Sequence, residues 1–267
     1  MRLTGTRACA TSTAPAPPQL TAGTRVGSLT GLLAEPQVRL GIGTAALLVT
    51  ALAVRRDRVS LGEAKVFRAV NGLPDALHAP AWAIMQLGTL GAAPAIAGAA
   101  WLAGDSELAG RLLASGTGTW VLSKLVKQMV RRPRPAALLA GTRCRGRDAA
   151  GLGYLSGHAG VAVALGAAAF PRLGTTGRAL TVAAVPVVGL ARVYVGAHLP
   201  LDIAGSAALG LAVEALVSLA TPRQPSRLPD TAPRALSGRK TASRGPQAGQ
   251  SSAEACSGIG AESKYCS

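Results

Sequence analysis

The sequence has few aromatic and few charged residues. Aromatic side chains make up 3% of the 267 residues and charged side chains 15%, whereas soluble domains usually carry about 25% charge. So few aromatic rings exclude a platform on which nucleic-acid bases could stack. The low charge is confined largely to the two ends and to short gaps in an apolar middle, which indicates a membrane protein.

Cysteine is also scarce, and no two cysteines have the spacing of a metal-binding pair. The four cysteines, which form no CxxC motif, are Cys9, Cys144, Cys256 and Cys266. Metal sites and disulfide frameworks are usually recognisable from such spacings. We therefore predict no metal site, no cofactor and no disulfide framework.

Acidic residues are the third shortage. Lys and Arg outnumber Asp and Glu by 28 to 12, which gives a formal net charge of +16. Such a basic balance is typical of proteins that bind nucleic acid or an anionic membrane surface. Here the basic residues fall in the tails and between the apolar runs, where membrane proteins carry them. The predicted partners are therefore membrane lipids and not nucleic acid.

Six apolar segments fill the middle of the chain. A membrane-spanning helix needs about 20 apolar residues; the fourth segment is short and reaches this length only if its helix begins at or before Ser156. We predict an all-α fold, an integral, multi-pass membrane bundle of about six transmembrane helices over residues 38–220. The segments run from Val38 to Val54, Ala79 to Gly104, Leu112 to Val130, Gly157 to Pro171, Ala179 to Val195 and Leu201 to Ala220.

The ends of the chain differ in composition from this middle. Residues 1–37 and 221–267 are rich in Pro, Gly, Ser, Thr and Arg, which predicts disordered N- and C-terminal tails. Six helices place both tails on one side of the membrane, so the gaps after the first, third and fifth helices share the other side. Lys and Arg divide evenly between the two sides, so the charge bias leaves the orientation open.

Ionisable residues gather in three clusters on the side opposite the tails. Charged groups near membrane spans are costly, and they mark functional sites by default. The first cluster closes the third helix, the second opens the fourth, and the third joins the fifth to the sixth. The clusters are Lys127 to Pro135, Tyr154 to His158, and Arg192 to Asp202.

The residue types in these clusters suit a phosphate group. Lys127, Arg134 and Arg192 supply cations, and guanidinium groups match phosphate oxygens bidentately. Ser156 and the backbone N–H groups that follow it, including that of Gly157, lie at a helix start, where anions bind. We therefore expect these five residues to bind phosphate.

The histidines of the second and third clusters suit phosphoryl transfer. His198 and Asp202 are four residues apart, so on a helix the carboxylate can hold one ring nitrogen and leave the other to attack phosphorus. His158 then remains to give a proton to the departing oxygen. Phosphoryl transfer depends mostly on positioning and charge stabilisation, which this set provides without a metal.

The three clusters resemble the signature motifs of the type 2 phosphatidic acid phosphatase superfamily, written KxxxxxxRP, PSGH and SRxxxxxHxxxD. Residues 127–135 match the first motif completely. Leu155 stands where the second motif has proline, and Ala191 stands where the third has its first serine. The resemblance covers roughly residues 60–220, and the three motifs occur in order on hydrophobic segments.

This resemblance implies a role for each matched residue. His198 would form a phosphohistidine, Asp202 would orient its ring, and His158 would be the general acid. Leu155 predicts a looser start of the fourth helix, and Ala191 predicts the loss of one hydrogen bond. The phosphate cradle that the resemblance implies consists of Lys127, Arg134, Ser156, Gly157 and Arg192.

The implied function is a membrane phosphatase that hydrolyses lipid phosphate or diphosphate esters. Polyprenyl diphosphate, phosphatidic acid and phosphatidylglycerophosphate all place a phosphate at the interface and a tail in lipid. The alternatives are a lipid phosphotransferase that uses the same site, and a non-catalytic membrane protein that binds or transports lipid. Vanadium haloperoxidases share a similar pocket but are soluble. The excess of arginine over lysine suits a GC-rich bacterial genome and favours the bacterial plasma membrane.

Charged residues outside the motifs are expected to have other roles. Glu214 lies about 18 Å along the sixth helix from Asp202. We therefore expect it to contribute to contacts between helices and not to the chemistry of the three clusters. The arginines between the third and fourth apolar segments are interpreted as a basic interfacial loop that attracts anionic lipid. These arginines are Arg131, Arg132, Arg143, Arg145 and Arg147.

Overall fold

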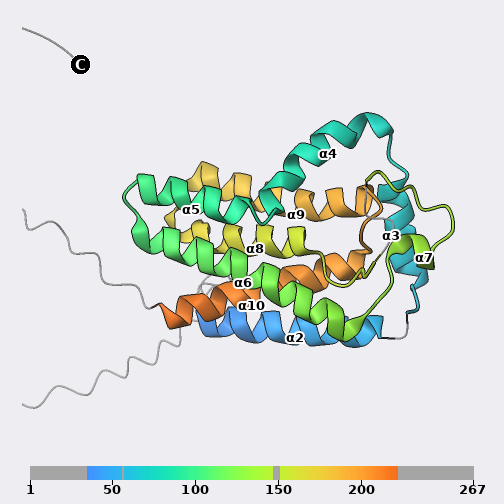
Figure 1. The fold of residues 1–267 in the computed structure, drawn as a ribbon, viewed down its shortest axis with the longest axis horizontal. Coiled ribbons are helices and arrows are strands. Elements are labelled where there is room, and N and C mark those ends of the chain that lie inside the picture. Colours follow the sequence, from blue (N-terminus) through green and yellow to red (C-terminus); the bar gives the residue numbers. More distant parts are fainter. Residues whose placement is uncertain (1–34, 56, 147–150, 222–267) are drawn as a thin grey trace, which may run out of the picture. The chain divides into compact units, whose positions relative to one another are not determined.

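The computed structural model describes residues 35–55, 57–146 and 151–221, and its regular elements are helices (Figure 1). The all-α prediction is confirmed for these residues, while most of the two predicted tails lies outside them. The elements are α2 (Pro36–Val54), α3 (Leu61–Asn71), η1 (Asp75–Leu77), α4 (His78–Met85), η2 (Gln86–Gly88), α5 (Ala92–Leu102), α6 (Ser106–Val130), α7 (Pro135–Leu138), α8 (Gly157–Ala169), η3 (Phe170–Arg172), α9 (Thr175–Tyr194) and α10 (Pro200–Ala220).

Three of these helices are long and apolar enough to cross a membrane. They are α2, α9 and α10. The second apolar segment, which we predicted from Ala79 to Gly104, is bent by 65° between the η1–η2 stretch and α5. If this bent pair forms one span, the described residues contain four candidate spans. The predicted count of six therefore stays a prediction.

The bundle is built around α10 and α8. Helix α10 packs against α2, α6 and α8, and α8 also packs against α6 and α9; these helices lie side by side in Figure 1. Small residues allow this close approach, as glycine commonly does between membrane helices. A methyl group placed on Gly43 of α2 would lie 2.8 Å from the carbonyl oxygen of Ala208 in α10. Gly210 of α10 likewise packs against the backbone of Gly160 in α8.

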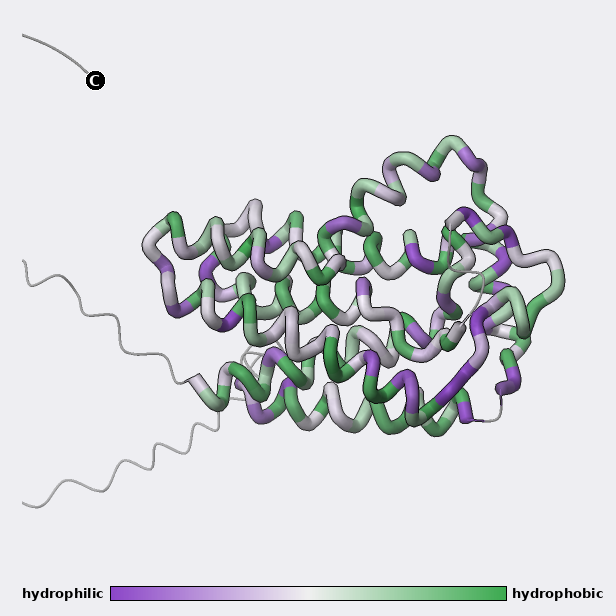
Figure 2. The backbone as a smooth tube through the Cα atoms, viewed as in Figure 1, coloured by the Kyte–Doolittle hydropathy of each residue, from purple (hydrophilic) through white to green (hydrophobic). Residues whose placement is uncertain are grey.

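Large apolar side chains face outward from the helices. Val49 on α2 is 65% exposed and Leu180 on α9 is equally exposed. In Figure 2 the helices are mostly hydrophobic, and hydrophilic stretches gather where α3 and the segment after α6 lie. Exposed apolar helix surfaces of this kind suit contact with lipid.

A short helix that the sequence analysis did not predict, α3, lies at the end of the bundle near α7. The Ser60 side chain caps it by accepting a hydrogen bond from the Glu63 backbone N–H at 3.1 Å. One face of α3 buries Phe67, which packs against Leu199 at the start of α10. Leu61, by contrast, is exposed, which gives the helix two different sides. Glu63 of α3 accepts a hydrogen bond from the Leu201 N–H at 3.1 Å. This acidic residue therefore lies close to the third predicted cluster.

Candidate active site

The three predicted clusters meet at one end of the bundle through backbone hydrogen bonds. Helix α6 ends at Arg131, whose φ of 56° turns the chain away from the helix axis. The chain then runs beside the segment that precedes α8, because Pro133 forms a β-bridge with Leu152. The Gly153 N–H donates to the Arg132 carbonyl at 2.7 Å. This pairing places the end of the first cluster next to the start of the second.

His198 joins the third cluster to this pair. It lies in the short loop between α9 and α10, where Gly196 has a φ of +78° that glycine adopts without strain. The imidazole is 2% exposed. Its Nδ1 lies 2.7 Å from the Gly153 carbonyl oxygen, so Nδ1 must carry the proton and donate it. The lone pair of a neutral ring is then on Nε2.

Charge and burial together keep this imidazole neutral. Burial lowers the pKa of His198 well below its ordinary value of 6.5, and the positive charges of Arg192, Lys127 and Arg134 lower it further. The hydrogen bond to the Gly153 carbonyl acts in the opposite direction and is outweighed. All three cations predicted to bind phosphate therefore act on the ring of the predicted nucleophile.

The three cations come from different elements. Lys127 lies in the last turn of α6, and Arg134 is the residue before α7. Arg192 lies in the last turn of α9, is 7% exposed, and directs Nη1 at the Met85 sulfur, 3.6 Å away. An anionic group held among these side chains would be attracted by all three positive charges.

The start of α8 is held firmly at the same end. Ser156 is fully buried and caps the helix by accepting a hydrogen bond from the Ala159 N–H at 3.4 Å. Its own N–H donates to the Ser206 hydroxyl of α10 at 2.6 Å. Gly157 and the half-buried His158 form the first residues of the helix. Backbone N–H groups at such a start are suited to hold an anion.

Asp202 lies next to His198 but does not hold its ring in the way that the sequence suggested. The closest approach, from His198 Nδ1 to Asp202 Oδ2, is 3.9 Å, which is longer than a hydrogen bond. Asp202 Oδ2 instead accepts the Leu199 N–H at 2.8 Å. The direct acceptor for the ring is the Gly153 carbonyl, at 2.7 Å from Nδ1.

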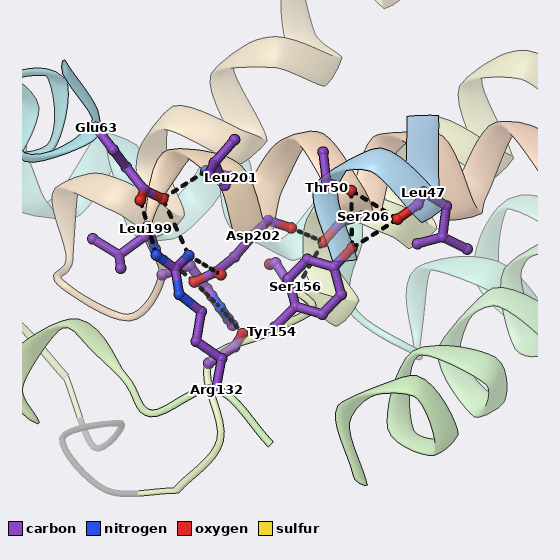
Figure 3. A network of polar contacts seen from close by, with 12 residues as sticks. Leu47, Thr50, Glu63, Arg132, Tyr154, Ser156, Leu199, Leu201, Asp202 and Ser206 are labelled. Carbon is purple, nitrogen blue, oxygen red and sulfur yellow. Dashed lines mark hydrogen bonds and ion pairs between the residues drawn. The ribbon is translucent and has the colours of Figure 1, made fainter. Parts of the chain in front are cut away.

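Arg132 corrects the interpretation of the basic loop. We expected it to face anionic lipid, but it is 0% exposed and lies between two carboxylates (Figure 3). It donates to Asp202 Oδ1 at 2.8 Å and to both oxygens of Glu63 at 3.1 and 2.8 Å. Burial works to lower the pKa of Arg132, but these two acids outweigh it and raise the pKa. Arg132 is therefore a charged, buried residue beside the site.

Arg145 is likewise no lipid-facing residue. Its guanidinium donates to the backbone carbonyls of Asn71, Leu73 and Tyr194, each at 2.8 Å. These bonds tie the long loop to the end of α3 and to the end of α9. Of the other arginines in that group, Arg147 lies outside the described residues.

The two departures from the family motifs have plain structural settings. Leu155 is fully buried and packs in an apolar cluster with Leu209 and Val213 of α10. Ser156, the residue after Leu155, forms hydrogen bonds with Ser206 and Ala159, and the looser helix start stays a prediction. Ala191 is buried in an apolar cluster with Met85.

Sequence reasoning missed three contributors to the site. Gly153 acts through its backbone carbonyl, for which no side chain gives a signal. Glu63 lies outside every motif, although an acid among apolar residues in a short amphipathic stretch is a usable signal. Ser206 was hidden among the small residues of the sixth apolar segment. Among the residues described by the structure, no three His, Cys, Asp or Glu side chains are placed to hold a metal ion.

A buried neutral imidazole beside three cations, at one end of an apolar helical bundle, defines a site suited to a phosphate group. A family model described as the PAP2 superfamily matches residues 108–225, a range that includes all three clusters. Residues 108–225 of this chain are thus similar to the PAP2 superfamily. This confirms the family resemblance that the motifs suggested.

Two solved structures have a similar fold. The crystal structure of Aquifex aeolicus LpxE has a TM-score of 0.54 and 21% identity, covering 59% of this chain and 94% of that one. The first transmembrane PAP2 type phosphatidylglycerolphosphate phosphatase from Bacillus subtilis has a TM-score of 0.55 and 22% identity, covering 67% and 94%. Comparison with curated proteins gave no match. The chain thus has the fold of PAP2-type membrane phosphatases.

Proposed function

We propose that this protein is a membrane phosphatase that hydrolyses lipid phosphate or diphosphate esters through a phosphohistidine at His198. The observation that carries the proposal is the state of the His198 ring. Its Nδ1 donates to the Gly153 carbonyl at 2.7 Å, and burial and the neighbouring cations lower its pKa well below 6.5. The ring is therefore a neutral nucleophile at physiological pH, with its Nε2 lone pair available for attack.

In the first step Nε2 of His198 attacks phosphorus and the bond from phosphorus to the leaving oxygen breaks. His158, in its protonated form, gives its proton to that oxygen, so the alcohol or lipid phosphate product leaves with this oxygen protonated. Lys127, Arg134 and Arg192 stabilise the charge on the phosphoryl oxygens during transfer. The Ser156 and Gly157 region contributes the start of α8 to the same cradle.

In the second step water attacks the phosphohistidine and releases inorganic phosphate. His158, now neutral, takes a proton from the water, which restores both histidines to their starting states. The ring of His198 carries positive charge while it is phosphorylated, because Nδ1 keeps its proton. The Asp202 carboxylate, 3.9 Å from Nδ1, favours that charge electrostatically.

The membrane helices support a lipid substrate. The proposed site residues lie at the ends of α6, α8, α9 and α10, and two of these helices, α9 and α10, are candidate spans. A phosphate bound there can belong to a molecule whose tail remains among the lipids. Polyprenyl diphosphate, phosphatidic acid and phosphatidylglycerophosphate are the substrates to test, and the bacterial plasma membrane is the proposed location.

We also propose six membrane crossings. Helix α6 has 25 residues, long enough at about 1.5 Å per residue to cross the hydrocarbon core. Helix α8 has 13 residues and is enclosed by α6, α9 and α10. A short helix surrounded by longer ones need not match the bilayer by itself, and it can still pass from one side to the other.

The test is phosphate release from a panel of these lipids by purified protein in detergent, with His198→Ala and His158→Ala beside the wild type. We expect release by the wild type, inhibition by vanadate, and loss of most turnover in both variants. Transfer of the phosphoryl group to another lipid or a sugar, in place of phosphate release, would favour the phosphotransferase. Lipid binding without turnover over the whole panel would favour the non-catalytic alternative.

A further inference from the structure

A buried ion cluster lies next to His198, the candidate nucleophile. We call Glu63, Arg132 and Asp202 the inner cluster. Their side chains are 3%, 0% and 0% exposed, and Arg132 bridges the two acids with bonds of 2.8 to 3.1 Å. The three residues come from α3, from the segment after α6 and from α10, so the cluster joins three separate parts of the chain (Figure 3).

The inner cluster holds the backbone that follows His198. The Leu199 N–H donates to Asp202 at 2.8 Å, and the Leu201 N–H donates to Glu63 at 3.1 Å. Pro200, between them, has no N–H to donate. Every backbone N–H in the three residues after His198 is thus bound by a carboxylate that Arg132 also holds.

Arg132 is also connected to the imidazole through its own backbone. Its carbonyl oxygen accepts the Gly153 N–H at 2.7 Å, and the Gly153 carbonyl accepts the His198 Nδ1 proton at 2.7 Å. The Arg132 guanidinium therefore helps to hold the loop that carries His198. The Arg132 backbone carbonyl holds Gly153, whose own carbonyl accepts the proton of the His198 ring. A shift of Arg132 would move both.

The charges of the inner cluster complement those of the phosphate cradle. With both carboxylates ionised, two acids and one arginine carry a net charge of −1. The cations Lys127, Arg134 and Arg192 lie on the side where phosphate would bind, and they disfavour a positive imidazole. An anionic group behind the ring opposes that effect when the ring becomes phosphorylated.

We infer that Glu63 and Arg132 are positioning residues for phosphoryl transfer, which fix the loop and the ring acceptor of His198 through Asp202, Leu201 and Gly153. The inference rests on the proposed function of His198. Neither residue is expected to touch the substrate. Such supporting residues typically change the rate of an enzyme by about 10-fold to 100-fold when they are replaced.

A purely structural cluster would also be buried and would also destabilise the fold when broken. The chain offers a matched control for this alternative. Glu214 is 1% exposed and bonds to Arg39 and Arg111 at 3.0 Å, at the other end of α10. Glu63→Gln and Glu214→Gln each replace one buried, arginine-bound carboxylate by its isosteric amide, whose NH₂ group then faces a guanidinium.

The experiment measures kcat, KM and thermal stability for wild type, Glu63→Gln and Glu214→Gln, with phosphate release from the best lipid of the panel. We expect the two variants to lose similar thermal stability. Below their unfolding temperatures, Glu63→Gln should lower kcat by about 10-fold or more with KM changed by less than about twofold. Glu214→Gln should keep kcat within about twofold of wild type.

A third variant, Glu63→Asp, keeps the charge and should have a kcat between those of wild type and Glu63→Gln. If Glu63→Gln does not fold, Glu63→Asp decides alone: a lowered kcat at unchanged KM supports the inference, and a wild-type kcat overturns it. Equal kcat losses in Glu63→Gln and Glu214→Gln, or a loss confined to KM, would also overturn it. An inactive wild type would instead refute the proposed function itself.

Discussion

Helix α10 carries two buried acidic residues, and their surroundings differ. Near its start, Asp202 belongs to the inner cluster, in which two acids share one arginine. Near its end, Glu214 belongs to an outer cluster in which Arg39 and Arg111 share one acid. The two acids are twelve residues apart, or about 18 Å along a helix.

The outer cluster joins side chains of the bundle to one another. Arg39 is on α2, Arg111 on α6 and Glu214 on α10, and their ion pairs measure 3.0 Å. The Ser218 hydroxyl donates to Glu214 at 2.6 Å and accepts from Arg111 at 2.6 Å. These contacts tie together the ends of three helices.

The inner cluster, by contrast, binds the backbone of the loop that carries His198. Two of its bonds go to main-chain N–H groups, those of Leu199 and Leu201. Burial and ion pairing are common to both clusters, so neither property identifies a functional site here. What distinguishes the inner cluster is its connection to a candidate reacting group.

The comparison is tested most strongly by removing one arginine from each cluster. Arg132→Met leaves Glu63 and Asp202 buried together without their shared cation, which should cost about 3–5 kcal/mol of unfolding free energy and abolish most activity. Arg111→Met leaves Glu214 paired with Arg39, so its cost should be clearly smaller. Thermal unfolding in detergent measures both. Equal losses of stability would show that the two clusters do not differ as described.

A second test replaces the acid of the inner cluster that is nearest to the ring. Asp202→Asn removes the charge 3.9 Å from His198 Nδ1 but leaves the hydrogen bond to Gly153, which fixes the tautomer. We therefore expect kcat to fall by about 10-fold to 100-fold and not to zero. Steady-state phosphate release gives the value. An inactive but folded variant would mean that Asp202, and not Gly153, orients the ring.

A third test compares two serines of α10. Ser206→Ala leaves the buried Ser156 N–H without its acceptor and should cost about 1–3 kcal/mol, with a several-fold loss of rate because the start of α8 loosens. Ser218→Ala removes a hydroxyl from the outer cluster and should affect stability without changing the rate. Unfolding and activity are measured on the same preparations. A rate loss in Ser218→Ala as large as in Ser206→Ala would remove the distinction.

The smallest predicted effect is a pH dependence of stability. The unfolded chain protonates His198 near pH 6.5, but burial and the cations lower its pKa in the folded protein, so below pH 6.5 the unfolded state binds more protons. Above pH 6.5 this residue therefore does not reduce the free energy of unfolding. Below pH 6.5 the free energy of unfolding declines as the pH falls, by at most about 1.4 kcal/mol per pH unit.

This pH effect can be isolated with His198→Asn, which cannot titrate. Unfolding temperatures of wild type and variant are compared between about pH 7.5 and pH 5. As the pH falls, the wild type should lose more stability than His198→Asn. A constant difference would mean that the ring is not held neutral in the folded protein.

Much of the helical architecture could be predicted from hydropathy alone. The apolar segments that became α2, α9 and α10 are long and uninterrupted, so their helices begin and end within a few residues of the expected positions. The bend between α4 and α5 was missed, because Gly88, Gly91 and Pro94 can break a helix while the segment as a whole stays apolar. Helix α3 was missed because eleven residues with one apolar face resemble a polar gap.

The site could be predicted in part, for a different reason. Motif spacing pointed to His198, Asp202 and the three cations, and the structure brings these residues together at one end of the bundle, while their roles stay predictions. The supporting contacts could not be found this way. The Gly153 carbonyl has no sequence signature, and Arg132 looked like its neighbours in a basic run until the fold turned it inward to Glu63.

The most direct test of the account is to trap the covalent intermediate. Purified protein is mixed briefly with a ³²P-labelled lipid phosphate, quenched in base, digested and mapped by mass spectrometry. We predict a base-stable, acid-labile phosphoryl group on the peptide that contains His198, absent from His198→Ala. Label on another residue, such as Ser156, or an unchanged rate of phosphate release by His198→Ala, would contradict the account.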